Sequence, residues 1–370
     1  MLSMLALAAA LQAPPTLNCE RLVLADLACA PTPYGVVIAD DQAMAERFAG
    51  IMRQGEASFR THFGREPQPY AVIVGDRANP LSEGGSVGGG SVDLQRQLRD
   101  AGAEHVQPWF TAEQRALISA RTQRARFEAI ARQQGLEGAD VTAFVEARLR
   151  TEPAPSTAEG DAGAAHELGH VWGVKTFWPD FDRRGPGQHY AGPGPDWFDE
   201  TVAILLEDGA MAADRRNEFR TQWAKPGGER PKPLASYFVD AHPAANGASG
   251  SRVMRVEDLP PGFLPPGGLK DGQPITLSGV IPSFARPVRA PGHAERMTMF
   301  YAQGRIFADF LIDRSGDPGL YGRIATALAA GQTMEQWIQG EGPALRLGGS
   351  VADLERDWME WLGRTYGPPG

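Results

Sequence analysis

The sequence AHELGHVWG, residues 165–173, predicts a helix that carries two histidines four residues apart. Residues at positions i and i+4 share one face of a helix, so the imidazoles of His166 and His170 can grip one zinc ion. Glu167 lies next to His166 and could reach a metal-bound water as general base. Gly173 suits the C-terminal end of the helix. Because the motif fixes few positions, a buried helix with two ordinary histidines stays an alternative at this point.

A zinc site of this kind needs a third protein ligand and an open position for water. The chain has two cysteines, which excludes a four-cysteine site. A third histidine six residues after His170 would complete another common zinc pattern, but that position is Thr176. Eighteen residues separate His189 from His170, and His189 lies within GPGQHYAGPGP, where proline and glycine disfavour a helix. His189 is therefore a weaker candidate than a carboxylate farther along the chain.

The segment PDWFDETVAILLE, residues 195–207, supplies such a carboxylate. Its apolar spacing predicts a helix, and Asp196 is expected to cap its first turn. Glu200, Ala203 and Glu207 fall on one side of this helix. Glu200 could meet the two histidines, and the small Ala203 would let the two helices approach. The alternative is that these acids simply face solvent.

These two segments carry a resemblance to a known family. HELGH and WFDETVAILLE resemble the H-E-x-x-H and W-L-N-E-G-x-A-x-x-x-E signature of gluzincin metallopeptidases, nearest to the aminopeptidase N and peptidase MA-like families. The resemblance implies that Glu200 is the third zinc ligand and that Glu207 orients a zinc-bound histidine. Thr201 and Val202 depart from the family pattern, at positions that touch no ligand.

The segment MFYAQG, residues 299–304, is similar to the Y-x-K-G element of the same family. The resemblance implies that the Tyr301 hydroxyl donates to the oxyanion of the tetrahedral intermediate. Gln303 stands where the family commonly has lysine. Residues that could replace Tyr301 in this role are Tyr190, His189 and Tyr237.

The resemblance extends to fold but not to specificity. It implies an α+β fold with a zincin catalytic core and a helical C-terminal subdomain. The G-x-M-E-N element with which aminopeptidases hold the substrate amine is absent from residues 93–160, so endopeptidase and exopeptidase activity both stay open. The expected division of the chain is a signal peptide (1–13), a strand–helix–strand portion (14–92), a helical segment and linker (93–160), the zinc-binding core (161–223), a Pro/Gly-rich cleft or lid segment (224–293) and the helical C-terminal subdomain (294–370).

Composition narrows the location and the partners of this 370-residue chain. The net charge of −9 argues against nucleic acid as a partner, and no later segment predicts a membrane span. The apolar start MLSMLALAAALQA resembles a signal peptide, although it lacks the usual basic residue. Cys19 and Cys29 could then pair in an oxidising compartment, with two unpaired thiols as the alternative. An extracytoplasmic location is therefore expected.

The expected function is that of a zinc-dependent metallopeptidase with one zinc ion per chain and a peptide or protein substrate. A zinc hydrolase of another amide or ester, or a non-catalytic zinc-binding scaffold, is the alternative, and no oligomeric state is predicted. The sequence gives no functional context to the remaining histidines, His62, His105, His242 and His293.

Overall fold

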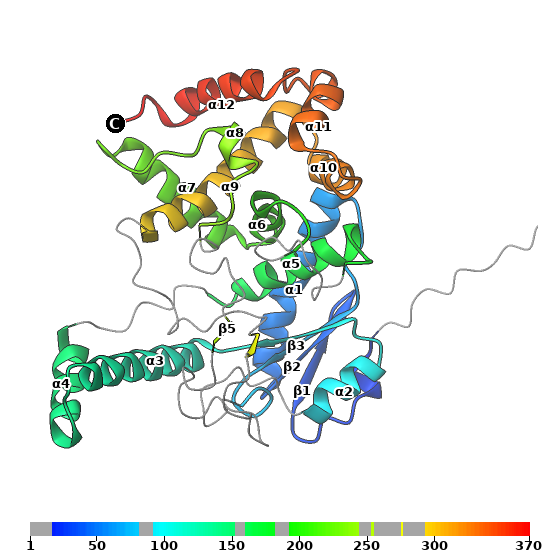
Figure 1. The fold of residues 1–370 in the computed structure, drawn as a ribbon. Helices are drawn as coiled ribbons and strands as arrows, with labels where there is room; N and C mark the ends of the chain where they lie inside the picture. Colours follow the sequence, from blue (N-terminus) through cyan, green and yellow to red (C-terminus); the bar gives the residue numbers. More distant parts are fainter. Residues whose placement is uncertain are drawn as a thin grey trace, which may run out of the picture.

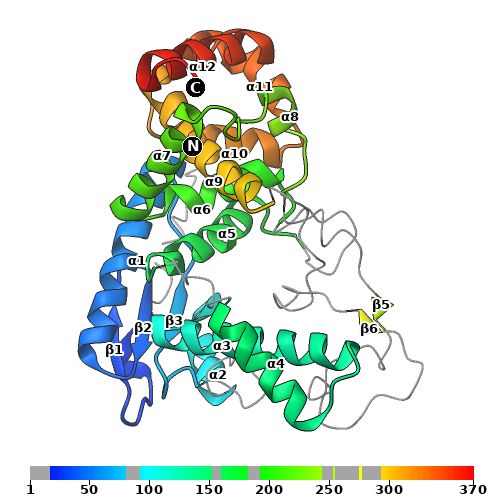
Figure 2. The same cartoon turned by 90° about the vertical axis from the view of Figure 1, so that its left-hand side faces the viewer.

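The protein combines a small sheet with many helices, which confirms the α+β class (Figures 1 and 2). The signal-peptide prediction (1–13), His189 and Tyr190 lie outside the described residues, as does most of the Pro/Gly-rich segment. No helix in the described part of the chain is long and apolar enough to cross a membrane. The computed structural model describes residues 17–80, 92–151, 160–181, 192–243, 253–254, 275–276 and 293–370.

A four-stranded sheet with the order β1-β2-β3-β4 forms the N-terminal half. β1 is antiparallel to β2, whereas β2, β3 and β4 run parallel. The expected strands are present as β2 and β3, but β4 lies within residues 93–160, which the sequence predicted to be helical. HVQPW offers only a short, weak alternation between two strongly helical segments, and Pro108 stands on the last strand of the sheet, where a missing N–H is tolerated. The strands are β1 (Ala28–Pro31), β2 (Gly35–Ala39), β3 (Tyr70–Val74) and β4 (His105–Trp109).

Successive side chains of a strand point to opposite sides of the sheet. In β2 and β3 every residue is buried, so both faces of these central strands are covered. Val37 and Val72 belong to the large core that also contains residues of the helices described below. Val36 and Ile38 belong to a smaller core on the other face, with Leu98 of α2 (Val92–Asp100). The sheet therefore separates the N-terminal segment and α2 from the rest of the molecule.

The predicted disulfide between Cys19 and Cys29 is present. It joins the short 3-10 helix η1 (Cys19–Arg21) to β1. Both cysteines pack against the smaller core. The alternative of two unpaired thiols is therefore wrong.

Helix α1 (Gln42–Phe63) crosses the face of the sheet that carries the large core. Asp41 caps its N-terminus, because the Asp41 carboxylate accepts a hydrogen bond of 2.8 Å from the Met44 amide. The helix ends at Gly64, which has a φ of +61°. Glycine adopts this left-handed conformation without strain, so the chain can turn back toward β3.

Glu56 of α1 is a buried carboxylate that ties the helix to the sheet. Its Oε1 accepts hydrogen bonds from Thr32 Oγ1 (2.6 Å), the Tyr34 amide (3.2 Å) and the Tyr70 hydroxyl (3.0 Å). Its Oε2 has no hydrogen-bond partner among the described residues. Burial raises the pKa of Glu56 above its usual value, and the three donors only partly offset this.

The stability of the Glu56→Gln variant against unfolding should depend less on pH than that of the wild-type chain. A folded-state pKa above the unfolded value gives stability that is present below the unfolded pKa and lost as the pH rises through the folded pKa. Glutamine keeps the acceptor and removes the charge, so the variant should gain stability relative to wild type between about pH 4 and about pH 7. Urea unfolding at both pH values measures the difference, at about 1.4 kcal/mol per pKa unit. Identical pH dependence in the two chains would contradict this explanation.

The other described elements are helical, apart from one two-stranded antiparallel sheet. Figure 2 shows α3 and α4 projecting as a hairpin from the part of the molecule that carries the sheet, while the C-terminal helices lie at the opposite end. The predicted helical character of residues 294–370 is confirmed. These elements are α3 (Ala112–Gln133), α4 (Gly138–Thr151), α5 (Gly163–Phe177), α6 (Asp196–Leu205), α7 (Gly209–Ala224), α8 (Leu234–Tyr237), β5 (Val253–Met254), β6 (Ile275–Thr276), α9 (His293–Ser315), α10 (Leu320–Ala329), α11 (Met334–Glu341), η5 (Pro343–Leu345) and α12 (Val351–Tyr366).

Helices α5 and α6 lie against each other between the sheet and the C-terminal helices (Figures 1 and 2). A Cβ on Gly169 would lie 2.7 Å from the Cα of Ala203, so the helices touch where both side chains are smallest. Gly173 does not end α5 as expected, because the helix continues to Phe177. A Cβ on Gly173 would lie 3.1 Å from Val202 Cγ1, so this glycine also serves the close approach of α6.

Candidate metal centre

The structure brings together the three residues that the sequence predicted as metal ligands. His166 and His170 lie on α5, and Glu200 lies on α6. One potential ligand atom from each lies within 4.8 Å of the others. The two imidazoles meet nearly edge to face, with ring centroids 5.1 Å apart. Packing of α6 against α5 therefore assembles a His-His-Glu group that could hold a metal ion.

One oxygen of Glu200 faces both histidines. Oε2 lies 3.6 Å from His166 Nε2 and 3.9 Å from His170 Nε2. Glu200 is only 2% exposed, and this oxygen has no hydrogen-bond partner in the described structure. A buried carboxylate oxygen without a partner is costly unless a cation compensates its charge. The residues present therefore fit a bound metal ion.

Each histidine is held from behind by a carboxylate. His166 Nδ1 lies 3.0 Å from Glu207 Oε1, and His170 Nδ1 lies 2.9 Å from Asp199 Oδ2. A carboxylate at Nδ1 fixes the ring orientation and the tautomer, which leaves Nε2 available to a metal. Glu207 lies just beyond the end of α6 and reaches His166 from there.

The charges in this group perturb one another strongly. Burial would lower the pKa of His170, but Asp199 and Glu200 outweigh it and raise the pKa to about 10. Burial raises the pKa of Glu200 to about 7, although both histidines act in the opposite direction. Burial also acts to raise the pKa of Glu207, but His166 and Arg215 together lower it. The site without metal thus retains protons that a bound cation would displace.

Arg215 of α7 contacts both Glu207 and Tyr301. Its Nη2 lies 2.9 Å from Glu207 Oε1, and its guanidinium carbon lies 4.7 Å from the centroid of the Tyr301 ring. A cation over an aromatic face is attracted by the ring, so Arg215 links Glu207 to Tyr301. Glu207, which contacts His166, is thereby itself held in place.

Tyr301 projects from α9 toward the metal-ligand group. Its ring centroid lies 6.3 Å from that of His166. Tyr237, one of its substitutes, is completely buried in the core and is not positioned to meet a substrate. Gln303, the residue at the family's lysine position, is buried and forms two hydrogen bonds with the backbone of Lys232, so it anchors the approach to α8.

Glu167 differs from its neighbours in being exposed. It follows His166 directly on α5, on a helix face turned by about 100° from that histidine. The carboxylate at this position is therefore accessible from solvent, as a general base that meets a substrate has to be.

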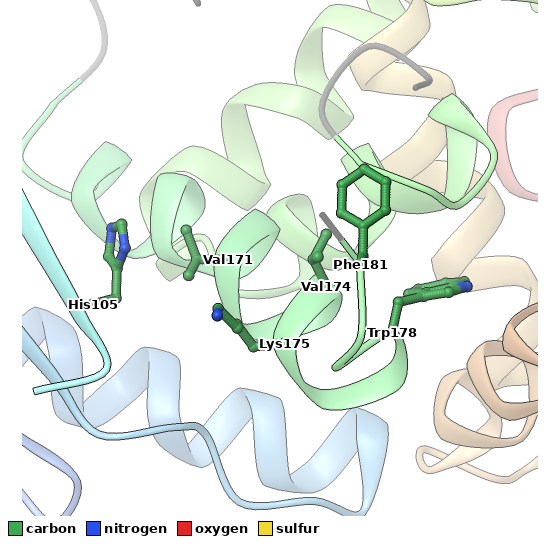
Figure 3. A pocket seen from close by; sticks show the side chains of 6 residues that line it. All are labelled: His105, Val171, Val174, Lys175, Trp178 and Phe181. Atoms are coloured by element: carbon green, nitrogen blue, oxygen red, sulfur yellow. The ribbon is translucent and has the colours of Figure 1, made fainter. Parts of the chain in front are cut away.

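A pocket of about 260 Å³ lies on the part of α5 that follows Glu167 (Figure 3). Val171 and Val174 line it, and they lie four and seven residues after Glu167, which places the three on one helix face. None of the three residues of the metal-ligand group lines this pocket. The pocket therefore borders the face of Glu167 and not the metal position itself. Its lining residues are His105, Val171, Val174, Lys175, Trp178 and Phe181.

Two residues of the site were not foreseen from the sequence. Asp199 stands in the recognised motif but was given no role. His242 was left without functional context, yet it is fully buried with Nε2 3.3 Å from Glu200 Oε1. Asp196 does not cap α6 as expected, because its Oδ2 accepts a hydrogen bond of 2.6 Å from the His242 amide. No sequence pattern links these positions.

Comparison with protein-family models, curated proteins and solved structures found no match to this chain. The resemblance to gluzincins therefore rests on the short motifs, and any functional assignment rests on the chemistry of the site.

Proposed function

We propose that this protein is a zinc-dependent metallopeptidase with a zincin-type core and a helical C-terminal subdomain. In this proposal His166, His170 and Glu200 hold one zinc ion per chain. The observation that carries it is the unpartnered Glu200 Oε2, buried and facing the two histidine Nε2 atoms. Two histidines and a carboxylate are a common ligand set for catalytic zinc, which keeps its fourth position open.

A bound zinc ion would polarise the substrate carbonyl and acidify water at the site. The Glu167 carboxylate would take a proton from the attacking water as its oxygen bonds to the carbonyl carbon. It would return that proton to the amine nitrogen when the carbon–nitrogen bond breaks. The Tyr301 hydroxyl would donate to the developing oxyanion.

The presence of Glu167 as a general base favours a hydrolytic role for the metal over a purely structural one. A structural zinc site is closed by four protein ligands, whereas the described group has three, beside an exposed Glu167. The Cys19–Cys29 disulfide supports the accompanying proposal of an extracytoplasmic location, because disulfides persist in oxidising compartments.

Zinc content and digestion of a peptide library test the proposal together. The purified full chain should contain about one zinc ion per chain, as measured by elemental mass spectrometry. Peptide products identified by mass spectrometry should disappear when a chelator removes the metal and return when zinc is restored. A chain that binds zinc but cleaves only esters or other amides would overturn the peptidase assignment. A chain that binds no zinc would overturn the metal site as well.

The Tyr301→Phe variant should lose catalysis without losing metal. Removing one donor to an oxyanion typically lowers kcat by about 10²–10³-fold. Zinc affinity and KM should stay close to the wild-type values, because the hydroxyl is not among the ligands. Tyr321→Phe is the matched control, since it removes a buried hydroxyl from α10, outside the metal-ligand group. A wild-type kcat for Tyr301→Phe would show that another group stabilises the oxyanion.

A further inference from the structure

His242 is buried at the back of the metal-ligand group, in the chain segment that follows α8. Its backbone amide donates a hydrogen bond of 2.6 Å to Asp196 in the first turn of α6. Its ring meets the ring of Phe300 on α9 edge to face, with centroids 4.8 Å apart. Contacts with two helices therefore fix both the backbone and the ring of this histidine.

The fixed ring places Nε2 against one oxygen of Glu200. Nε2 lies 3.3 Å from Glu200 Oε1, whereas Oε2 of the same carboxylate faces His166 and His170. The two carboxylate oxygens thus have different surroundings. Oε1 lies in electrostatic contact with the imidazole Nε2, at a geometry that is not that of a hydrogen bond, and Oε2 faces the position that a metal ion would take.

We propose that His242 is a positioning residue that holds Glu200 Oε1, so that only Oε2 is presented to the metal. This inference rests on the proposed zinc site. A carboxylate can bind a metal through one oxygen or through both, and free rotation of the Glu200 side chain would permit either arrangement. Binding through one oxygen leaves the fourth position of a tetrahedral zinc site open to water.

His242 acts through Glu200 and is not itself a ligand. The described group whose ligand atoms lie within 4.8 Å of one another contains His166, His170 and Glu200, but not His242. Each proposed ligand therefore has a neighbouring polar group: Glu207 is hydrogen-bonded to His166, Asp199 is hydrogen-bonded to His170, and the His242 ring nitrogen lies 3.3 Å from Glu200. Supporting groups of this kind typically contribute a factor of about 10–100 to metal affinity.

Substitution of the His242 side chain leaves its backbone contact with Asp196 available. His242→Leu fills much of the same space and removes the ring nitrogen that faces Glu200. In His242→Gln the side-chain amide can reach the position of the imidazole Nε2, whereas the shorter amide in His242→Asn cannot. His62→Leu is the matched control, because it makes the same chemical change at a histidine of α1 outside the metal-ligand group.

Zinc affinity of the full chain, measured by competition with a chelator, tests the proposal. We expect His242→Leu to bind zinc about 10–100-fold more weakly than wild type, His242→Gln to recover most of that loss, and His62→Leu to bind as wild type does. Visible absorption of the cobalt-substituted protein reports on coordination geometry, and it should change in His242→Leu and His242→Asn but not in His242→Gln or His62→Leu.

Equal zinc affinity and equal cobalt spectra in wild type and His242→Leu would overturn the role of His242. If His242→Leu does not fold, His242→Gln and His242→Asn decide between the outcomes, because equal affinities of these two would also overturn it. A wild-type chain that binds no zinc would instead overturn the proposed metal site. The two failures are therefore distinguishable.

Discussion

The Glu167→Gln variant should bind zinc as tightly as the wild-type chain and should turn over substrate about 10²–10⁴-fold more slowly. Glutamine preserves the size of the side chain but has no basic carboxylate to accept a proton. Metal affinity should be unchanged, because Glu167 is exposed and lies outside the ligand group. Single-turnover cleavage of a peptide chosen from the library digest, together with chelator competition, separates the chemical step from metal binding.

The matched control for this experiment is Glu113→Gln, an identical change at an exposed glutamate in the first turn of α3. Its kcat should equal that of the wild-type chain. A Glu167→Gln variant with wild-type kcat would assign proton transfer to another group. Loss of zinc from Glu167→Gln would indicate a different error, namely that Glu167 takes part in holding the metal.

Helical periodicity predicts which residues share a face within α5 and within α6, whereas the meeting of the two faces was expected only from the resemblance to the gluzincin signature. His166 and His170 share a face at any helical position, and Glu200 and Ala203 share another. The structure adds that Gly169 meets Ala203, a contact that explains why the helices approach closely enough for three ligands to converge. The same periodicity could not show that Gly173 serves this packing and does not end the helix.

The contacts behind the ligands depend on the tertiary fold and could not be predicted. His242 is forty-six residues from Asp196 in the chain, and no local pattern relates the two. Strand β4 was missed for a related reason, because its pairing with β3 and not its own weak alternation makes it a strand. Asp199 belongs to the sequence motif, but it precedes Glu200 on the helix, and adjacent helical residues point about 100° apart. Only the placement of α5 shows that this direction leads to His170 Nδ1.

Adjacent residues on α6 permit a graded test of the ligand assignment. The Glu200→Ala variant should lose zinc and all zinc-dependent turnover, because it removes one of three ligands and leaves His166 and His170 alone. The Asp199→Ala variant should bind zinc only about 10–100-fold more weakly, because His170 keeps its ligand nitrogen and loses just the carboxylate that orients it.

Excess zinc distinguishes the two variants further. It should restore turnover to Asp199→Ala, in which all ligands are present, but not to Glu200→Ala. Because the two acids are neighbours on one buried helix, general disruption of α6 would affect both variants alike. Retention of zinc by Glu200→Ala together with loss from Asp199→Ala would reverse the assignment and make Asp199 the ligand. The order of the two affinities therefore decides which carboxylate binds the metal, independently of any change in stability that both substitutions share.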